Sequence, residues 1–72
     1  MIVHFWSNRW VDKTKEKLTM HLQRVPLIGE SIEIDGTDRP EHGYYQVRMV
    51  STTLEFHGST NAAVESYEVI LI

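Results

Sequence analysis

Cysteine is absent from the 72 residues of this chain. Without thiols the protein can form no disulfide, no thiolate zinc site and no cysteine nucleophile. Small domains usually need such additions, because a core of this size stabilises a fold by only about 3–5 kcal/mol. We therefore expect the chain to gain further burial by associating with copies of itself as a homo-oligomer.

The chain also lacks an excess of positive charge, since seven Lys and Arg residues stand against ten Asp and Glu residues, for a net charge of −3. Proteins that bind nucleic-acid backbones in general carry a basic surplus. General binding of DNA or RNA is therefore not expected.

Long hydrophobic runs are missing as well. No stretch approaches the ~20 apolar residues of a membrane-spanning helix. The amino-terminal segment, Met1–Trp6, has neither the basic start nor the apolar length of a signal peptide. We expect a cytoplasmic protein without membrane contact, and the length suits a single domain, 1–72.

Alternation of apolar and polar residues is the dominant pattern in the chain. It predicts four to five short antiparallel strands, with turns at Asp35-Gly36 and 57–61. The expected strands are 1–6, 18–22, the stretch around Ile32 and Ile34, a long strand from Tyr44 to Phe56, and 62–72. The apolar parity changes near Met49–Ser51, which predicts a β-bulge. The fold class is all-β, as a small SH3-like antiparallel barrel or a strongly twisted sheet.

Residues 11–23 leave two interpretations open, a strand or a helix that begins after Asp12. The helix would carry Lys13, Lys15 and Lys17 in its early turns, where positive charge opposes the helix dipole. It would also leave Met20 off its apolar face. We prefer the strand.

The chain ends in four apolar residues, Val69-Ile70-Leu71-Ile72, which are apolar at both parities of a strand. Such a strand is covered on both faces or buried between subunits. In a domain this thin, a second internal layer is hard to supply. We predict that Val69, Ile70, Leu71 and Ile72 form the oligomer interface.

Two further segments resemble a known pattern. Val25–Ile32 and Tyr44–Val50 are similar to the V-P-x-x-G-[DE]-x-[IV] … Y-x-V-x-x-V arrangement of short β-barrel proteins from phages and bacterial mobile elements. The resemblance implies a compact SH3-like barrel. It also implies a protein that acts by binding, as small phage proteins inhibit a host protein or sequester a host signalling nucleotide.

Four residues are our candidates for ligand binding: Arg9, Trp10, Tyr44 and Arg48. Tryptophan and tyrosine can stack on a nucleobase, and arginine can pair with a phosphate. We assign Trp6 to the core, because its parity matches that of Ile2, and Trp10 to the binding surface. An ordinary solubilising face is the alternative explanation for Tyr44 and Arg48.

A window of five acids offers a second kind of site: Glu30, Glu33, Asp35, Asp38 and Glu41. It lacks the residue order of a calcium loop, but it could face a basic surface on a host protein. The four histidines, His4, His21, His42 and His57, show no H-x-H or H-x-x-x-H spacing. We expect no metal.

No catalytic motif is present: there is no G-x-S-x-G, no phosphate-binding loop and no G-x-G-x-x-G. We therefore predict a non-enzymatic oligomeric binding protein without a cofactor. The leading hypothesis is a phage-type counter-defence protein that sequesters a small nucleotide-like ligand between subunits. The alternatives are an interaction module that inhibits a host protein through the acidic window, or a small structural protein of a virion.

Overall fold

The computed structural model describes residues 1–10, 17–58 and 61–72. These residues form five strands and one 3-10 turn: β1 (Ile2–Ser7), η1 (Asn8–Trp10), β2 (Leu18–His21), β3 (Ser31–Ile34), β4 (Gly43–Phe56) and β5 (Ala63–Leu71). The all-β fold class is confirmed. Within these ranges, no helix has the length and apolar character needed to cross a membrane.

The strand interpretation of the second segment is confirmed over Leu18–His21, where β2 pairs with β1. The rival helix is therefore wrong in its described part, because the ladder to β1 occupies the backbone that a helix would use internally. Residues 11–16, on which both interpretations also rested, lie outside the described residues.

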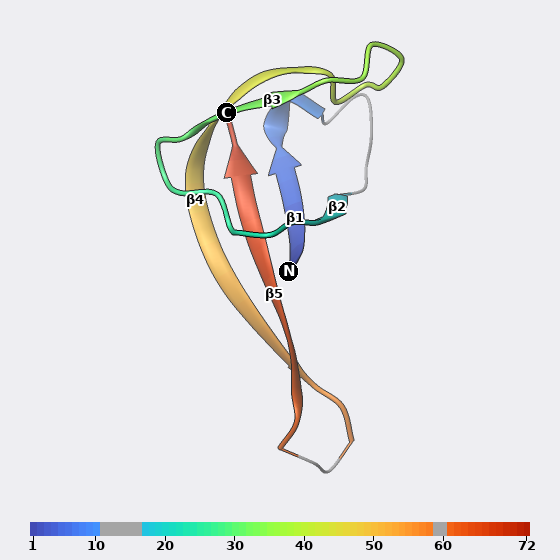
Figure 1. Cartoon of the computed structure of the whole chain (residues 1–72), viewed down its shortest axis with the longest axis vertical. Coiled ribbons are helices and arrows are strands. Elements are labelled where there is room, and N and C mark those ends of the chain that lie inside the picture. Colours follow the sequence, from blue (N-terminus) through green and yellow to red (C-terminus); the bar gives the residue numbers. More distant parts are fainter. Residues whose placement is uncertain (11–16, 59–60) are drawn as a thin grey trace.

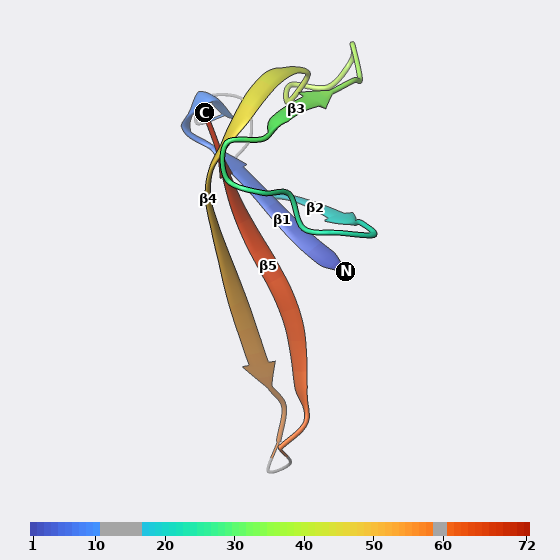
Figure 2. The same cartoon turned by 60° about the vertical axis from the view of Figure 1, so that its left-hand side comes forward.

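All five strands belong to one sheet in the order β2-β1-β5-β4-β3, which curls into a half-barrel (Figures 1 and 2). The pairs β1–β2, β3–β4 and β4–β5 are antiparallel, as expected, but β1 and β5 are parallel. Parallel neighbours need a long crossover connection. Here β2, β3 and β4 supply that connection, so the first and last strands of the chain lie side by side at the centre of the sheet.

The concave face of the half-barrel holds the core. Alternation along β1 turns Val3 and Phe5 inward, and the same face of β5 contributes Val69 and Leu71. The remaining buried core residues are Trp10, Tyr45 and Val47. The core therefore gathers side chains from β1, η1, β4 and β5, which are segments far apart in the sequence.

A bulge in β4 lies between Val47 and Met49, where the register against β5 shifts by one residue. The predicted change of parity is thus confirmed. Before the bulge Val47 is buried, and after it the core-facing position passes to Val50 while Met49 is 53% exposed. The extra residue bends the strand and helps the sheet to curl.

The far part of the β4–β5 hairpin extends beyond the rest of the sheet as an arm, defined here as residues 51–56 and 63–65 (Figure 1). β3 accompanies β4 only over Gly43–Gln46, and β1 accompanies β5 only from Ser66 onward. Gly58, with φ +69°, lies in the turn at the tip, where a side chain would strain the backbone. The arm is a two-stranded ribbon with both faces uncovered by this chain's described residues.

Candidate functional site: the cleft of the half-barrel

The two edge strands of the sheet, β2 and β3, lie on opposite sides of a single cleft. The cleft has a volume of about 490 Å³, and its lining includes Leu18, Thr19 and Met20 of β2 and Ile32, Glu33 and Ile34 of β3. This volume is within the ~300–1,000 Å³ range of small-ligand pockets. The curl of the half-barrel positions the site, because it brings the two ends of the sheet toward each other (Figure 2).

The cleft is mainly apolar, with polar groups at a few positions. Phe5 of the core lies at its base, and Leu22 and Pro26 come from the segment that connects β2 to β3. The polar contributors besides Thr19 and Glu33 are Asp35 and Arg39. An apolar lining with few polar groups is typical of ligand-binding pockets.

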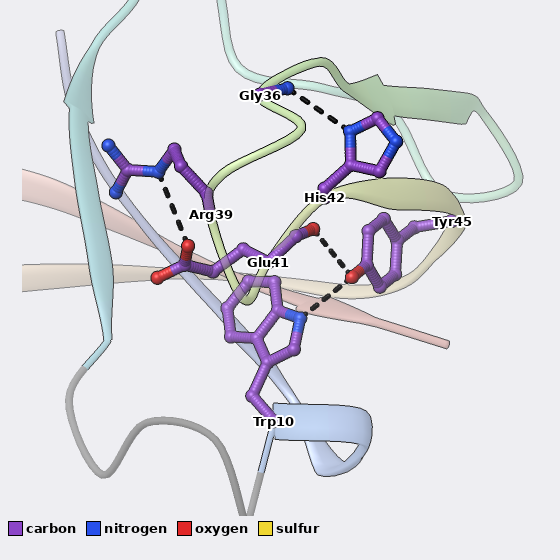
Figure 3. A network of polar contacts seen from close by, with 6 residues as sticks. All are labelled: Trp10, Gly36, Arg39, Glu41, His42 and Tyr45. Carbon is purple, nitrogen blue, oxygen red and sulfur yellow. Dashed lines mark hydrogen bonds and ion pairs between the residues drawn. The ribbon is translucent and has the colours of Figure 1, made fainter.

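Arg39 joins the cleft to a hydrogen-bond network in the core. Its Nε donates to Oε2 of Glu41 at 3.3 Å, and the Glu41 side chain is only 10% exposed. The backbone carbonyl of Glu41 accepts a hydrogen bond of 2.7 Å from the Tyr45 hydroxyl. Tyr45 in turn accepts one of 2.8 Å from Nε1 of Trp10 (Figure 3). This network fixes the loop between β3 and β4 against the core.

The assignment of the two tryptophans was wrong. Trp10 is 3% exposed and packs edge-on against Tyr45, with 5.7 Å between ring centroids, whereas Trp6 is 39% exposed. Parity with Ile2 was a misleading guide, because Val3 and Phe5 are the inward residues of β1. The 3-10 turn η1, which follows β1, places Trp10 in the core.

Arg9 also serves the fold. Its guanidinium donates to the carbonyl of Tyr44 at 2.7 Å, and its Cζ lies 4.2 Å from the centroid of the Tyr45 ring. The guanidinium is attracted to the electron-rich face of that ring. Arg9 and Trp10 therefore both contact the start of β4, Arg9 at the carbonyl of Tyr44 and the ring of Tyr45, and Trp10 at Tyr45.

Tyr44 and Arg48 are the candidates that stay on the surface. Tyr44 is 76% exposed, and a hydrogen bond to Glu33 raises the pKa of its phenol. Arg48 is exposed at the bulge and forms no ion pair with the described residues. Gln46 lies between them in the sequence and is exposed as well, so the three residues share the solvent-facing side of β4.

The predicted interface of four terminal residues divides into two pairs. Val69 and Leu71 are 0% exposed in the single chain, so their assignment to a subunit interface was wrong. They are covered because the sheet curls over them. Alternation along one strand does not show that the same sheet supplies this cover. Ile70 is half-buried and Ile72 is 45% exposed, and an interface through these two stays a prediction.

The acidic window is largely engaged within the chain. Arg24 holds Glu30 through both carboxylate oxygens, and the backbone N–H of Leu27 donates to Oε2 at 2.9 Å. The hydrogen bond to Arg24, with that of Leu27, lowers the pKa of Glu30 to about 2. Together with the Glu41–Arg39 pair, this leaves less free negative charge than the sequence suggests.

No protein family model, curated protein or solved structure matches this chain. The resemblance to phage β-barrel proteins therefore stays a prediction. Among the described residues, no group of three acidic or histidine side chains gathers closely enough to hold a metal ion.

The cleft was not identified from the sequence. The alternation pattern identifies its residues only as apolar positions of short strands, Leu18 and Met20 in one and Ile32 and Ile34 in another. The available signal was the shortness of both strands, which is typical of sheet edges. Nothing in either segment indicates that the two edges face each other.

Proposed function

We propose that this chain is a non-enzymatic binding module that takes up an extended, apolar segment of another protein in the cleft between β2 and β3. The observation that carries the proposal is that both edge strands of the described sheet line the same apolar cleft. The proposal belongs to the class of protein-interaction modules, with the cleft in place of the acidic window as the binding surface.

An edge strand offers unpaired N–H and C=O groups, to which an extended segment can add as a further strand. β2 and β3 have four residues each, so the added segment is about four to six residues long. Its alternate side chains would point into the cleft, where Leu18, Ile32 and Ile34 offer apolar contacts. Filling this gap would extend the half-barrel toward a closed barrel, which buries both edges.

Two charged residues of the cleft, Asp35 and Arg39, can contact the ends of such a segment. Asp35 follows β3 directly, and Arg39 is 56% exposed at its side chain while it pairs with Glu41. One acidic and one basic group can contact the backbone or flanking charges of a peptide. If the bound segment belongs to a host protein, its capture in the cleft would inhibit that protein.

A synthetic hexapeptide of alternating Val and Thr residues tests the proposal. We expect saturable binding, with amide chemical-shift changes concentrated in Leu18–His21 and Ser31–Ile34. Met20→Lys should weaken binding about tenfold or more, because it places a charge in the apolar cleft. Ile28→Lys is the matched control, since Ile28 is 68% exposed and is not part of the cleft lining.

Equal weakening by both lysine variants, or shift changes away from β2 and β3, would contradict binding in the cleft. A panel of alternating apolar hexapeptides, none of which binds at millimolar concentration, would contradict it as well. The cleft would then lack the function proposed for it.

The nucleotide-like ligand remains the second candidate, and it is favoured by the exposed Tyr44 and the unpaired guanidinium of Arg48 among the described residues. Calorimetry with ATP and a cyclic dinucleotide tests it. Binding that Arg48→Ala and Tyr44→Ala both abolish would support this candidate. The nearby Glu33 carboxylate, which accepts a hydrogen bond from Tyr44, would oppose a phosphate there.

A further inference from the structure

The arm presents an unpaired strand edge. On the outer side of β4, pairing within the described residues stops at Val47, whose N–H and C=O bond to Glu30 and Gly29. Residues 48–56 therefore offer a long edge with no partner strand in the described chain and no proline. Long, exposed and apolar strand edges pair with other chains unless a protein blocks them.

Apolar side chains accompany this edge. Leu54 is 56% exposed and Phe56 is 58% exposed, and both share the face of β4 that carries Val50 into the core. An isolated two-stranded ribbon is marginally stable in water, so the arm needs a further strand to cover it.

We propose that this edge of β4, residues 48–56, pairs with the same edge of a second copy of this chain, antiparallel about a two-fold axis. A two-fold axis makes the same patch complementary to itself. In this arrangement Leu54 and Phe56 of one copy approach Val50 of the other, and the two half-barrels join into one continuous sheet.

The charges along the edge are complementary under that symmetry. Arg48 lies at one end of the edge and Glu55 near the other, and residues 49–72 contain no lysine or arginine. Antiparallel pairing brings Arg48 of one copy close to Glu55 of the second copy. Within one chain these residues are about 23 Å apart along the strand, too far for an ion pair.

The exposed area of the chain agrees with a missing partner. A compact protein of 8.4 kDa exposes about 4,600 Å², whereas this chain exposes 5380 Å². The excess of about 800 Å² is of the same order as the area that one partner buries in a standard-size interface.

Sedimentation equilibrium of the full chain tests the proposal. We expect a dimer, and Leu54→Lys should raise its dissociation constant about tenfold or more. Leu27→Lys is the matched control, because Leu27 is 71% exposed outside the arm, and it should leave the dissociation constant unchanged. A wild-type chain that stays monomeric at millimolar concentration, or equal association of Leu54→Lys and wild type, would overturn the proposal.

A charge exchange adds a readout that a folding defect cannot imitate. Arg48→Glu alone and Glu55→Arg alone should each weaken the dimer, and the double variant should restore it. The double variant can restore the dimer only through an ion pair between copies, because residues 48 and 55 of one chain are too far apart to form one. Two single variants with unchanged association, or a double variant weaker than both, would overturn the assignment. Peptide binding by the cleft is measured separately, so either proposal can fail without the other.

Discussion

At the scale of single residues, two adjacent tyrosines have opposite roles. Tyr45 is 5% exposed, and its hydroxyl accepts from Trp10 and donates to the carbonyl of Glu41. Tyr44 is exposed and bonds to Glu33 at the surface. Tyrosine thus stabilises the core at position 45 and is exposed to solvent at position 44, because successive residues of a strand face opposite sides.

Tyr45→Phe should lower the free energy of unfolding by about 1–3 kcal/mol, because the Trp10 indole N–H and the Glu41 carbonyl both lose their buried partner. Tyr44→Phe is the matched control and should change it by less than about 0.5 kcal/mol. Urea unfolding of the two variants measures the difference. Equal stability of both would show that the hydroxyl of Tyr45 contributes nothing.

The positions of the two tryptophans can be measured by fluorescence. Trp6→Phe leaves only the buried Trp10, and we expect its emission to lie at shorter wavelength and to be quenched less by acrylamide than that of Trp10→Phe. The reverse order of quenching would restore the assignment that parity with Ile2 suggested. Trp10→Phe should also destabilise the fold, since the indole N–H cannot be replaced.

At the scale of elements, the segment between β2 and β3 is held by an ion pair. Arg24 and Glu30 close it through two hydrogen bonds, and Gly29, with φ +87°, directs its N–H to the carbonyl of Val47. The segment also supplies Leu22 and Pro26 to the cleft. Its conformation therefore affects the shape of the proposed binding site.

The pH dependence of stability follows from this pair. Arg24 lowers the pKa of Glu30 from an ordinary value of 4.5 to about 2, so the folded state prefers the ionised carboxylate. The resulting stabilisation is complete above pH 4.5 and is lost as the pH falls toward 2. We expect Glu30→Gln to reduce the drop in melting temperature between pH 6 and pH 2.5.

The same pH series on Glu65→Gln is the control. Glu65 accepts a hydrogen bond from Tyr67 and forms no ion pair among the described residues, so Glu65→Gln should leave the acid-induced drop unchanged. An acid-induced drop that is unchanged by Glu30→Gln would show that the pair contributes no stability.

At the scale of the whole molecule, the carboxyl-terminal strand belongs to the core of the single chain. β5 lies between β1 and β4, and Leu71 is 0% exposed while Ile72 is 45% exposed. Because β5 lies between β1 and β4, the two halves of the sheet are joined only through this strand.

Leu71→Ala should lower the free energy of unfolding by about 2–5 kcal/mol, because it leaves a cavity in a closely packed core. Ile72→Ala should cost less than about 1 kcal/mol, since nearly half of that residue is already exposed. Chemical denaturation at several protein concentrations measures both. If the loss caused by Leu71→Ala vanished on dilution, the residue would act at a subunit interface, contrary to the structure.

The sequence by itself determined the strands, the turn that begins at Gly36 and the bulge near Met49. These features follow from alternation and from turn chemistry within a few residues, and both are local. The tertiary structure alone decided which tryptophan is buried, which strands are parallel and that β2 and β3 share a cleft. Alternation separates the two faces of a strand but does not say which face turns inward, and pairing between distant strands depends on contacts that no local pattern records.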